Sequence, residues 1–347
     1  MSNEKDAKSE QDVNNAKDEP DKQSAKDETG EQDATDVKDG QDEQNTEGEQ
    51  NETDVKNARN EMKVKDETKV KRQKGSRRDA YRVQLPYDFN AMFPYIMKRR
   101  CDSVIFFSES IDVENVLRYV EAKKTTDEKV SFFQVILLAI VKLLRERPEL
   151  NRYAKGRRLY QRKNIVLNFI AKREFSDTAS ETNVTVRIEP EDRYETILDK
   201  ITGGIRVAKA GEEKDDDKTI STLMRLPRFL LMLLFKFLDF TDFYGIMPKS
   251  LESIDPIRCS VFVANLGSVG IDAPFHHLFE WGTNSLFLTI GCIKKTPFVE
   301  EDGTIVAKTM VDMKVSLDER ISDGFYYARS LDMFKQFLQD PESLENL

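Results

Sequence analysis

The clearest hydrophobic pattern of the chain lies near its C-terminal end. From residue 311 to residue 317, apolar and polar side chains alternate strictly, as VDMKVSL. This period of two is typical of a strand with one buried face, and continuing it places Glu319 on the buried side. Asp323 and Gly324 then turn the chain, and residues 327–338 have the apolar spacing of an amphipathic helix. The pattern therefore predicts a strand, a turn and a helix.

A second strong pattern is the apolar run from residue 132 to residue 147. Ser131 and Gln134 in front of it have the spacing of a capping box, and Pro148 ends it within its next turn. This helix is apolar almost all round, so we expect it at the centre of the fold. Weaker patterns predict helices at 89–100, at 113–124 behind Asp112 as N-cap and at 194–208, and strands at 103–108, 164–172, 183–188, 259–264 and 285–293. Helices that alternate with strands indicate an α/β fold.

The most lipid-like segment is FLLMLLFKFLDF, residues 229–240. A helix that spans a bilayer needs roughly 20 apolar residues, so this one is too short to cross a membrane. We interpret it as a buried helix or one packed in an interface. The alternative is a helix that lies on a membrane surface, although Arg225, Arg228 and Lys236 do not form an extended cationic face.

Composition separates the N-terminal part from the rest of the chain. Residues 1–75 hold 22 acidic and 14 basic side chains and no aromatic one, so they carry −8 of the net charge of −9. Such a segment cannot bury enough apolar surface to offset its ordering entropy, and we predict a disordered acidic tail. One folded domain, 80–345, is expected behind it, because no linker-like segment interrupts that range.

The tail meets the domain in a basic junction that runs from Lys63 to Arg78. Such a cluster could contact RNA, anionic lipid or an acidic partner, or fold back onto the acidic tail, which we favour. The remainder of the chain is nearly neutral, so we expect no nucleic-acid partner.

Cysteine content and the first residues indicate the compartment. The three cysteines, Cys101, Cys259 and Cys292, are far apart and odd in number, so a disulfide framework is not expected. The N-terminal sequence MSNEKDAKSEQD has no apolar stretch of a signal peptide. We therefore expect a cytoplasmic protein.

Three segments together resemble a known family. They are SFFQVILLAIVKLLRERPELN (131–151), SVFVANLGSVG (260–270) and DERISDGF (318–325). Their combination is similar to the catalytic domain of dihydrolipoyl acyltransferases, the 2-oxoacid dehydrogenase acyltransferases, which share their fold with chloramphenicol acetyltransferase. The resemblance implies a two-layer α/β sandwich with a mixed sheet, a homotrimer, and coenzyme A as co-substrate bound in a channel between subunits.

The resemblance also assigns roles to individual positions. In the family, a histidine of the motif histidine-x-x-x-aspartate-glycine takes the proton of the CoA or dihydrolipoamide thiol, and Glu319 occupies that position here. Asp323 and Gly324 keep the rest of the motif, and the resemblance pairs Asp323 with Arg99 or Arg100. Ala264 falls where the family has a serine or threonine that binds the oxyanion, and a shift of one residue puts Asn265 there instead.

These departures leave two functions open. In the first, Glu319 is an unusual base of a free-standing CoA-dependent acyltransferase that uses a thiol, amine or alcohol acceptor. A carboxylate is normally a weaker base than imidazole, and burial can compensate for that. In the second, Glu319 is structural, for example paired with Arg320, and the chain is a catalytically silent homologue that binds acyl-CoA or a partner protein.

The only two histidines, His276 and His277, belong to the segment HHLFEWG. They could line the active site or act as a relocated base, or they could be a pair satisfied by the backbone, which we favour. A metal site is not expected, because no spacing of metal ligands recurs. The sequence also shows no lipoyl-type turn, so no swinging arm is expected in the chain.

Overall fold

A six-stranded mixed sheet organises the part of the chain that the computed structural model describes, residues 75–84, 89–124, 129–172, 181–210 and 224–347. The predicted tail, 1–75, lies outside these residues except for Gly75. The order of the strands is β2-β9-β8-β7-β5-β6, in which β5, β7 and β8 are parallel and the other neighbours antiparallel. The strands are β2 (Val104–Asp112), β5 (Ile165–Lys172), β6 (Glu181–Ile188), β7 (Val261–Asn265), β8 (Leu286–Val299) and β9 (Ile305–Asp318).

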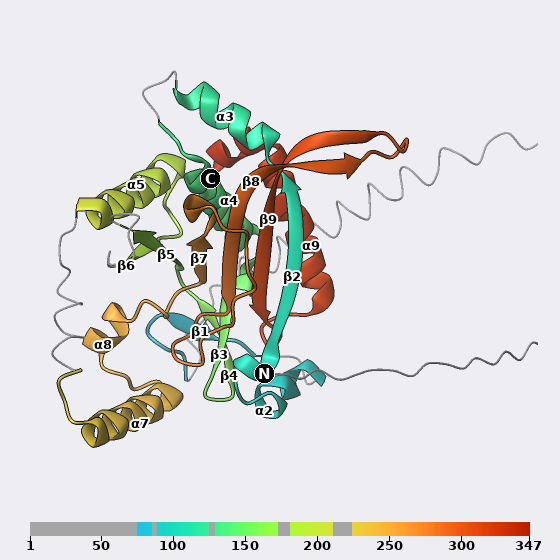
Figure 1. Cartoon of the computed structure of the whole chain (residues 1–347). Helices are drawn as coiled ribbons and strands as arrows, with labels where there is room; N and C mark the ends of the chain where they lie inside the picture. The colour runs from blue at the N-terminus through green and yellow to red at the C-terminus, as the bar shows by residue number, and fades with distance from the viewer. Residues whose placement is uncertain (1–74, 85–88, 125–128, 173–180, 211–223) are drawn as a thin grey trace, which may run out of the picture. The chain divides into compact units, whose positions relative to one another are not determined.

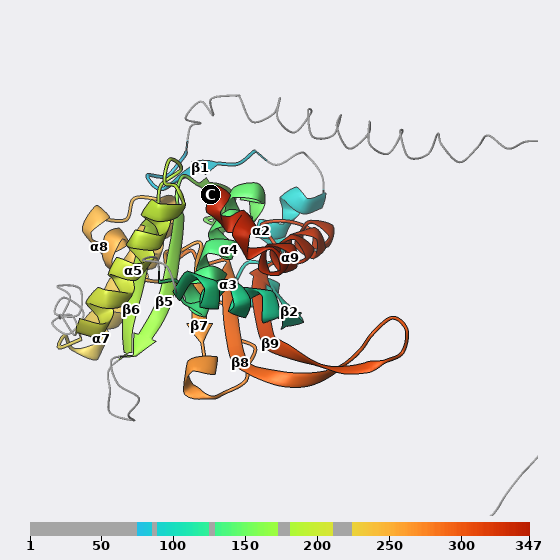
Figure 2. The ribbon, with the colours of Figure 1, turned by 90° about the horizontal axis from the view of Figure 1, so that it is seen from above.

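Four helices cover one face of this sheet, as Figure 2 shows. They are α3 (Glu114–Lys124), α4 (Phe132–Glu146), α5 (Tyr194–Ala210) and α9 (Gly324–Gln339). The core between the two layers contains most of α4, whose side chains from Val135 to Val141 are all buried. The capping box of α4 is confirmed, because Ser131 accepts from the Gln134 N–H and Gln134 reaches back to the Ser131 N–H. The predicted two-layer sandwich with a mixed sheet is therefore confirmed.

Smaller elements surround one end of the sandwich. A second sheet has the order β1-β4-β3 and consists of β1 (Ala80–Arg82), β3 (Arg152–Lys155) and β4 (Arg158–Arg162). Beside it lie short helical segments, η1 (Phe89–Met92), α2 (Phe93–Ile96) and η2 (Cys101–Ser103), and α7 (Arg228–Tyr244) and α8 (Lys249–Ile254) lie at the outer edge (Figure 1).

Several predicted boundaries are wrong for local reasons. The helix expected over 89–100 ends at Ile96, and Arg100 instead begins a 3-10 turn that leads into β2. The strand expected over 103–108 continues to Asp112, which still caps the next helix by accepting from the Glu114 N–H at 3.0 Å. The helix α9 begins at Gly324, where a turn was expected. The helix over 229–240 is not buried, since most of its large apolar side chains are exposed.

The turn after β7 has little space, and this gives a prediction on stability. A Cβ atom at Gly267 would lie 2.2 Å from the carbonyl oxygen of Gly291, whereas nothing lies within 4 Å of a Cβ at Gly203, inside α5. We expect Gly267→Ala to reduce the free energy of unfolding by about 1–3 kcal/mol, because the backbone of β8 must move. Gly203→Ala is the matched control and should raise it by about 0.5–1 kcal/mol, because alanine favours the helix. Urea unfolding of both variants measures the difference, and equal stabilities would contradict it.

Candidate functional site

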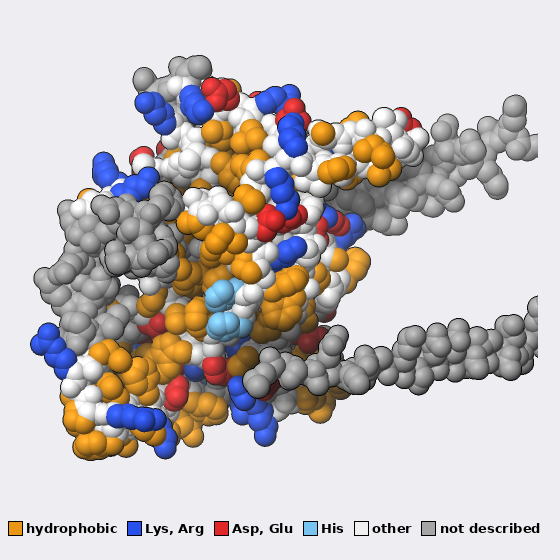
Figure 3. Space-filling model, viewed as in Figure 1, with side chains coloured by type: hydrophobic (Ala, Val, Ile, Leu, Met, Phe, Trp, Pro, Cys, Tyr) orange, Lys and Arg blue, Asp and Glu red, His pale blue; other side chains and the backbone are white. Residues whose placement is uncertain are grey.

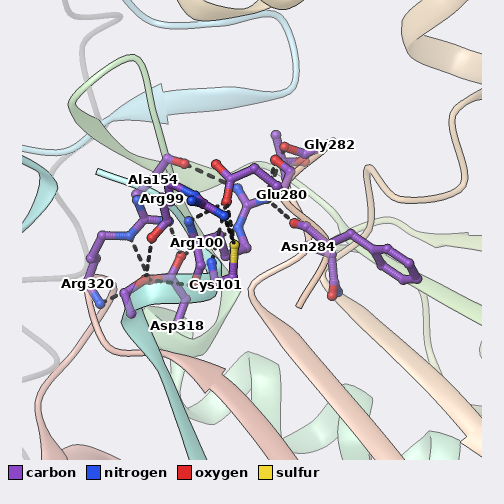
Figure 4. Close-up of polar contacts among 12 residues, drawn as sticks. Arg99, Arg100, Cys101, Ala154, Glu280, Gly282, Asn284, Asp318 and Arg320 are labelled. Carbon is purple, nitrogen blue, oxygen red and sulfur yellow. Dashed lines mark hydrogen bonds and ion pairs between the residues drawn. The ribbon is translucent and has the colours of Figure 1, made fainter. Parts of the chain in front are cut away.

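The family-like motif surrounds a buried carboxylate, that of Asp318 at the end of β9. Arg320 binds it with two charge-assisted hydrogen bonds, from Nε to Oδ1 at 2.8 Å and from Nη2 to Oδ2 at 2.7 Å. Ser103 Oγ donates to Oδ1 at 2.9 Å, and Arg100 Nε forms an ion pair with Oδ2 at 3.6 Å. Figure 4 shows how the two guanidinium groups converge on Asp318. We call these four residues the Asp318 cluster.

Arg100 connects the Asp318 cluster to distant segments. Its Nη1 donates to carbonyl oxygens of residues 279–282, the shortest bond being 2.8 Å to Phe279, and its Nη2 donates to the carbonyl of Ala154. Burial lowers the pKa of this guanidinium, and Asp318 counteracts that effect. Burial also opposes the charge of Arg320, but the hydrogen bonds to Asp318 outweigh it and raise the pKa of Arg320. The cluster thus joins β2, β3, β9 and the segment before β8.

The backbone around Glu319 is fixed from both sides. The Glu319 N–H donates to the carbonyl of Ser103 at 2.8 Å, and the Tyr327 hydroxyl donates to the carbonyl of Asp318 at 2.8 Å. The Glu319 side chain is half-buried and lines a pocket of about 240 Å³ together with Phe93 and Glu149. The expectation that Glu319 lies on the buried side is therefore met only in part, because β9 ends at Asp318, one residue before Glu319.

The two glutamates that line this pocket differ in their partners. Glu149 Oε2 accepts from Ser322 Oγ at 2.8 Å and forms an ion pair with Arg152 at 3.0 Å. No described residue forms an ion pair or a side-chain hydrogen bond with the Glu319 carboxylate. The alternative in which Glu319 forms an ion pair with Arg320 is not observed, because Arg320 binds Asp318 instead. Glu319 is thus the unpaired carboxylate of the two.

A cationic pocket of about 340 Å³ adjoins the Glu319 pocket, and both are lined by Val83 and Gln84. Arg82, Arg157 and Arg158 line it with the exposed Tyr95, and none of its described lining residues is acidic. Arg157 has a φ of 60° in the hairpin between β3 and β4 and donates to the carbonyls of Pro94 and Lys98. Arginines of this kind bind phosphate groups well, because guanidinium offers paired donors.

The other residues of the motif do not have the partners that the resemblance implies. Asp323 is exposed and caps α9 by accepting from the Tyr326 N–H at 2.8 Å, and Gly324 is the first residue of that helix. Arg99 is exposed and lies 3.9 Å from Asp102. Arg100 contacts Asp318 and not Asp323. The pairing of Asp323 with Arg99 or Arg100 is therefore wrong, and the buried arginine partner belongs to Asp318.

Ala264 and Asn265 lie far from Glu319 within one chain. Ala264 pairs with Thr289 across β7 and β8, and Thr289 pairs with Lys314 of β9. Ala264 is therefore level with Lys314, two strands away from β9, and Lys314 lies four residues before Asp318. The strand spacing and the rise per residue then put Ala264 on the order of 15 Å from Asp318. A single chain does not bring the proposed base and the proposed oxyanion position together.

The two histidines lie on the sheet face opposite the helices. The ring of His276 stacks on Phe287, with the centroids 3.9 Å apart, and on His277 at 4.6 Å. Burial lowers the pKa of His276 below that of a free imidazole. Figure 3 shows the pair in a hollow among apolar side chains. Neither histidine lines the Glu319 pocket, so the structure does not place them beside Glu319.

Two features of this site were not predicted from the sequence. The Asp318 cluster was missed, although an acidic residue at the end of a buried strand with a basic residue two positions on was a usable signal. The pairing of Glu149 also was missed, because it depends on the turn after α4 meeting the motif. Among the described residues, no group of three or more histidine, cysteine or acidic side chains has the geometry to hold a metal ion.

Comparison with known proteins confirms the resemblance. A family model described as 2-oxoacid dehydrogenases acyltransferase (catalytic domain) matches residues 250–345. The lipoamide acyltransferase component of the branched-chain alpha-keto acid dehydrogenase complex of Bacillus subtilis is 24% identical over 238 residues, which are 66% of this chain and 45% of that protein. The chain thus spans about half the length of this curated relative.

Solved structures of similar proteins share low sequence identity with the chain. A dihydrolipoamide acetyltransferase of Azotobacter vinelandii is 15% identical, with a TM-score of 0.49, over 76% of this chain and 94% of that one. A probable dihydrolipoamide acetyltransferase of Listeria monocytogenes is 17% identical, with a TM-score of 0.48, over 74% of this chain and 94% of that one.

Proposed function

We propose that this chain, whose residues 250–345 match the catalytic domain of the 2-oxoacid dehydrogenase acyltransferases, transfers an acyl group between coenzyme A and a second thiol, with Glu319 as the base. The name of the curated relative supports a lipoamide-type thiol as acceptor. An amine or alcohol acceptor stays open, because the residues around Glu319 do not distinguish these groups.

The proposal rests on the carboxylate of Glu319, which is unpaired among the described residues, half-buried and attached to a fixed backbone. A catalytic base must have a free lone pair and a defined position, and residues at functional sites are commonly held by a rigid support. The Asp318 cluster provides that support, and Glu149 is excluded as an equivalent base because Arg152 and Ser322 occupy its carboxylate. Of the two glutamates that line this pocket, Glu319 is therefore the one whose carboxylate is free to accept a proton.

The proposed reaction uses this carboxylate in two steps. Glu319 takes the proton from the thiol of the acceptor, and the thiolate attacks the carbonyl carbon of the acyl thioester. The tetrahedral oxyanion then collapses, the bond from carbon to the sulfur of CoA breaks, and Glu319 returns the proton to the departing thiolate. The new thioester and free CoA are the products, so no oxidant or reductant is needed.

The position that the family resemblance gives to the oxyanion donor lies outside the immediate surroundings of Glu319. Ala264 has no hydroxyl and lies on the order of 15 Å away within the chain, as the strand pairing requires. We propose that a second copy completes the site, in keeping with the homotrimer that the family resemblance implies. The Asn265 amide of the neighbouring copy is the candidate donor, since it follows Ala264 at the end of β7.

The three arginines beside the Glu319 pocket support CoA as the carrier, because CoA has phosphate groups and lipoamide has none. We expect Arg82→Gln and Arg158→Gln each to raise the KM for acetyl-CoA roughly tenfold, as loss of one charged hydrogen bond does. The KM for dihydrolipoamide should stay the same. Steady-state kinetics with both substrates measure this, and Arg118→Gln on the exposed side of α3 is the control. Equal KM changes for both substrates would contradict a phosphate contact.

A second function also has an observation in its favour. The missing hydroxyl at Ala264 is what a silent homologue would show. Such a chain would bind acyl-CoA without turning it over. Both functions therefore predict that the chain binds acyl-CoA, and they differ in whether the acyl group is transferred.

The experiment that separates them uses the full chain. Calorimetric titration with acetyl-CoA measures binding, and release of free CoA in the presence of dihydrolipoamide measures turnover. Binding with turnover supports the acyltransferase, and binding without turnover supports the silent homologue. If acetyl-CoA does not bind, both proposals fail.

A further inference from the structure

Helix α7, Arg228–Tyr244, exposes its large apolar side chains to the outside. Its buried residues are Leu238, Thr241 and Asp242 alone, whereas Phe229 is 69% exposed and Leu233 is 65% exposed. Phe237, Phe240 and Tyr244 are also exposed by more than half. Figure 3 shows this apolar surface at the lower left of the molecule, where Figure 1 places α7. Exposed apolar patches of this kind mark interaction sites.

The exposed residues form an ordered pattern around the helix axis. At 100° per residue, Phe229, Leu233, Phe237, Phe240 and Tyr244 fall within one arc of roughly 80°. Arg228, Lys236 and Asp239 fall together on one side of that arc. The outer side of α7 is therefore an apolar stripe with a charged border, and we call the five apolar residues the α7 stripe.

The helix is fixed to the body of the protein by buried charges. Asp242, 1% exposed, forms ion pairs with Arg258 at 2.7 Å, Lys155 at 2.9 Å and Arg77 at 3.0 Å. Burial alone would raise the pKa of Asp242, but these cations outweigh it and lower the pKa. On the same side, Phe235 packs edge-on against Trp281. The α7 stripe is thus a rigidly presented surface, because its opposite side is held by the core.

The size and charge of this surface favour a lipid bilayer over a second copy. A 17-residue helix is about 25 Å long and about 10 Å wide, so its footprint of about 250 Å² is well below the roughly 800 Å² per partner of a stable dimer. Among the described residues 224–244, Arg225, Arg228 and Lys236 are exposed, and the exposed acid there is Asp239. A second copy would oppose this positive border with another, whereas anionic lipid complements it.

We propose that α7 lies in the interface of an anionic bilayer, with the α7 stripe among the acyl chains and Arg228 and Lys236 among the phosphate headgroups. The described residues 224–244 have three exposed cations and one exposed acid, although the whole chain has a net charge of −9. The docking is peripheral, because no helix in the described part of the chain is long and apolar enough to cross a membrane. This inference does not depend on the proposed acyl transfer.

Flotation of the full chain with lipid vesicles tests the proposal. We expect the chain to float with vesicles of equimolar phosphatidylcholine and phosphatidylglycerol, to bind vesicles of phosphatidylcholine alone much more weakly, and to lose binding at high salt. Leu233→Glu and Phe240→Glu should each weaken binding at least about tenfold, because each removes a buried side chain from the bilayer. Ile305→Glu is the matched control, since Ile305 is 72% exposed but lies at the hairpin between β8 and β9, and it should bind like the wild type.

Three results would overturn the proposal. The wild type could fail to float with anionic vesicles, or the α7 variants could bind as well as Ile305→Glu does. The third is a dimer in sedimentation velocity that Leu233→Glu dissociates while no vesicle is bound, which would assign the α7 stripe to a second copy. Unfolding in urea controls for misfolding, and the variants should match the wild type because the changed side chains are exposed.

Discussion

The Glu319→Gln variant is expected to lose acyl transfer by roughly 10²–10⁴-fold, the usual contribution of a general base. Glutamine has nearly the same shape but cannot take the thiol proton. Because no described residue binds the Glu319 carboxylate, the fold should not depend on its charge, and the free energy of unfolding should stay within about 0.5 kcal/mol. The affinity for acetyl-CoA should be unchanged, so the loss should appear in kcat.

Glu149→Gln is the matched control for this result. Glu149 lines the same pocket and carries the same charge, but its carboxylate is bound by Arg152 and Ser322. We expect this variant to keep kcat within several-fold of the wild type. If both variants lose activity equally, the effect is the charge of the pocket and not a proton transfer by Glu319.

The largest effect on stability is expected for Asp318→Ala. The variant leaves Arg320 and Arg100 buried without a carboxylate, and removing one partner of a buried ion pair costs about 3–5 kcal/mol. Both guanidinium groups lie at the junction of β2, β9 and the segment before β8, so their repulsion cannot be relieved by a small shift. Urea unfolding should show a large decrease in the midpoint, and activity should fall with it because Glu319 loses its support.

Asp312→Ala is the control on the same strand. Asp312 forms a partly exposed ion pair with Lys294 at 2.9 Å, and exposed pairs of this kind contribute about 0–1 kcal/mol. If both variants lose a similar free energy of unfolding, the burial of Asp318 does not make its ion pairs more stabilising than the exposed pair of Asp312. Arg320→Lys provides a further comparison, since lysine keeps the charge but not the paired hydrogen bonds.

The fold could be predicted well from the sequence where local patterns determine it. The capping box at Ser131 and the alternation in residues 311–317 depend on neighbouring residues alone. The structure has the capping box in full and the alternation of burial from Val311 to Val315, after which Ser316 is buried as well. The hairpin of β3 and β4 was missed, because its strands are short and Arg157 takes a left-handed conformation that usually indicates glycine. The exposure of α7 was missed because an apolar helix normally predicts burial, and its sequence does not reveal that only one side meets the core.

The site could be predicted only in part for the same reason. The motif led to Glu319, but the groups that fix this segment are more than 150 positions away in the sequence. Ser103 binds the Glu319 N–H, Arg100 binds Asp318, and Glu149 binds Ser322. The resemblance made Asp323 the partner of Arg99 or Arg100, whereas in the structure Arg100 forms an ion pair with Asp318. Where β9 ends also could not be inferred, and that end decides whether Glu319 is buried or lines a pocket.

In the proposed reaction, a carboxylate at position 319 takes the proton of the thiol. Chemical rescue tests it most directly, by measuring the release of CoA from acetyl-CoA by Glu319→Ala with and without added formate. We expect the variant to be inactive alone and formate to restore turnover in a saturable manner, because formate can occupy the space that the side chain leaves. A Glu319→Ala variant as active as the wild type would contradict the claim.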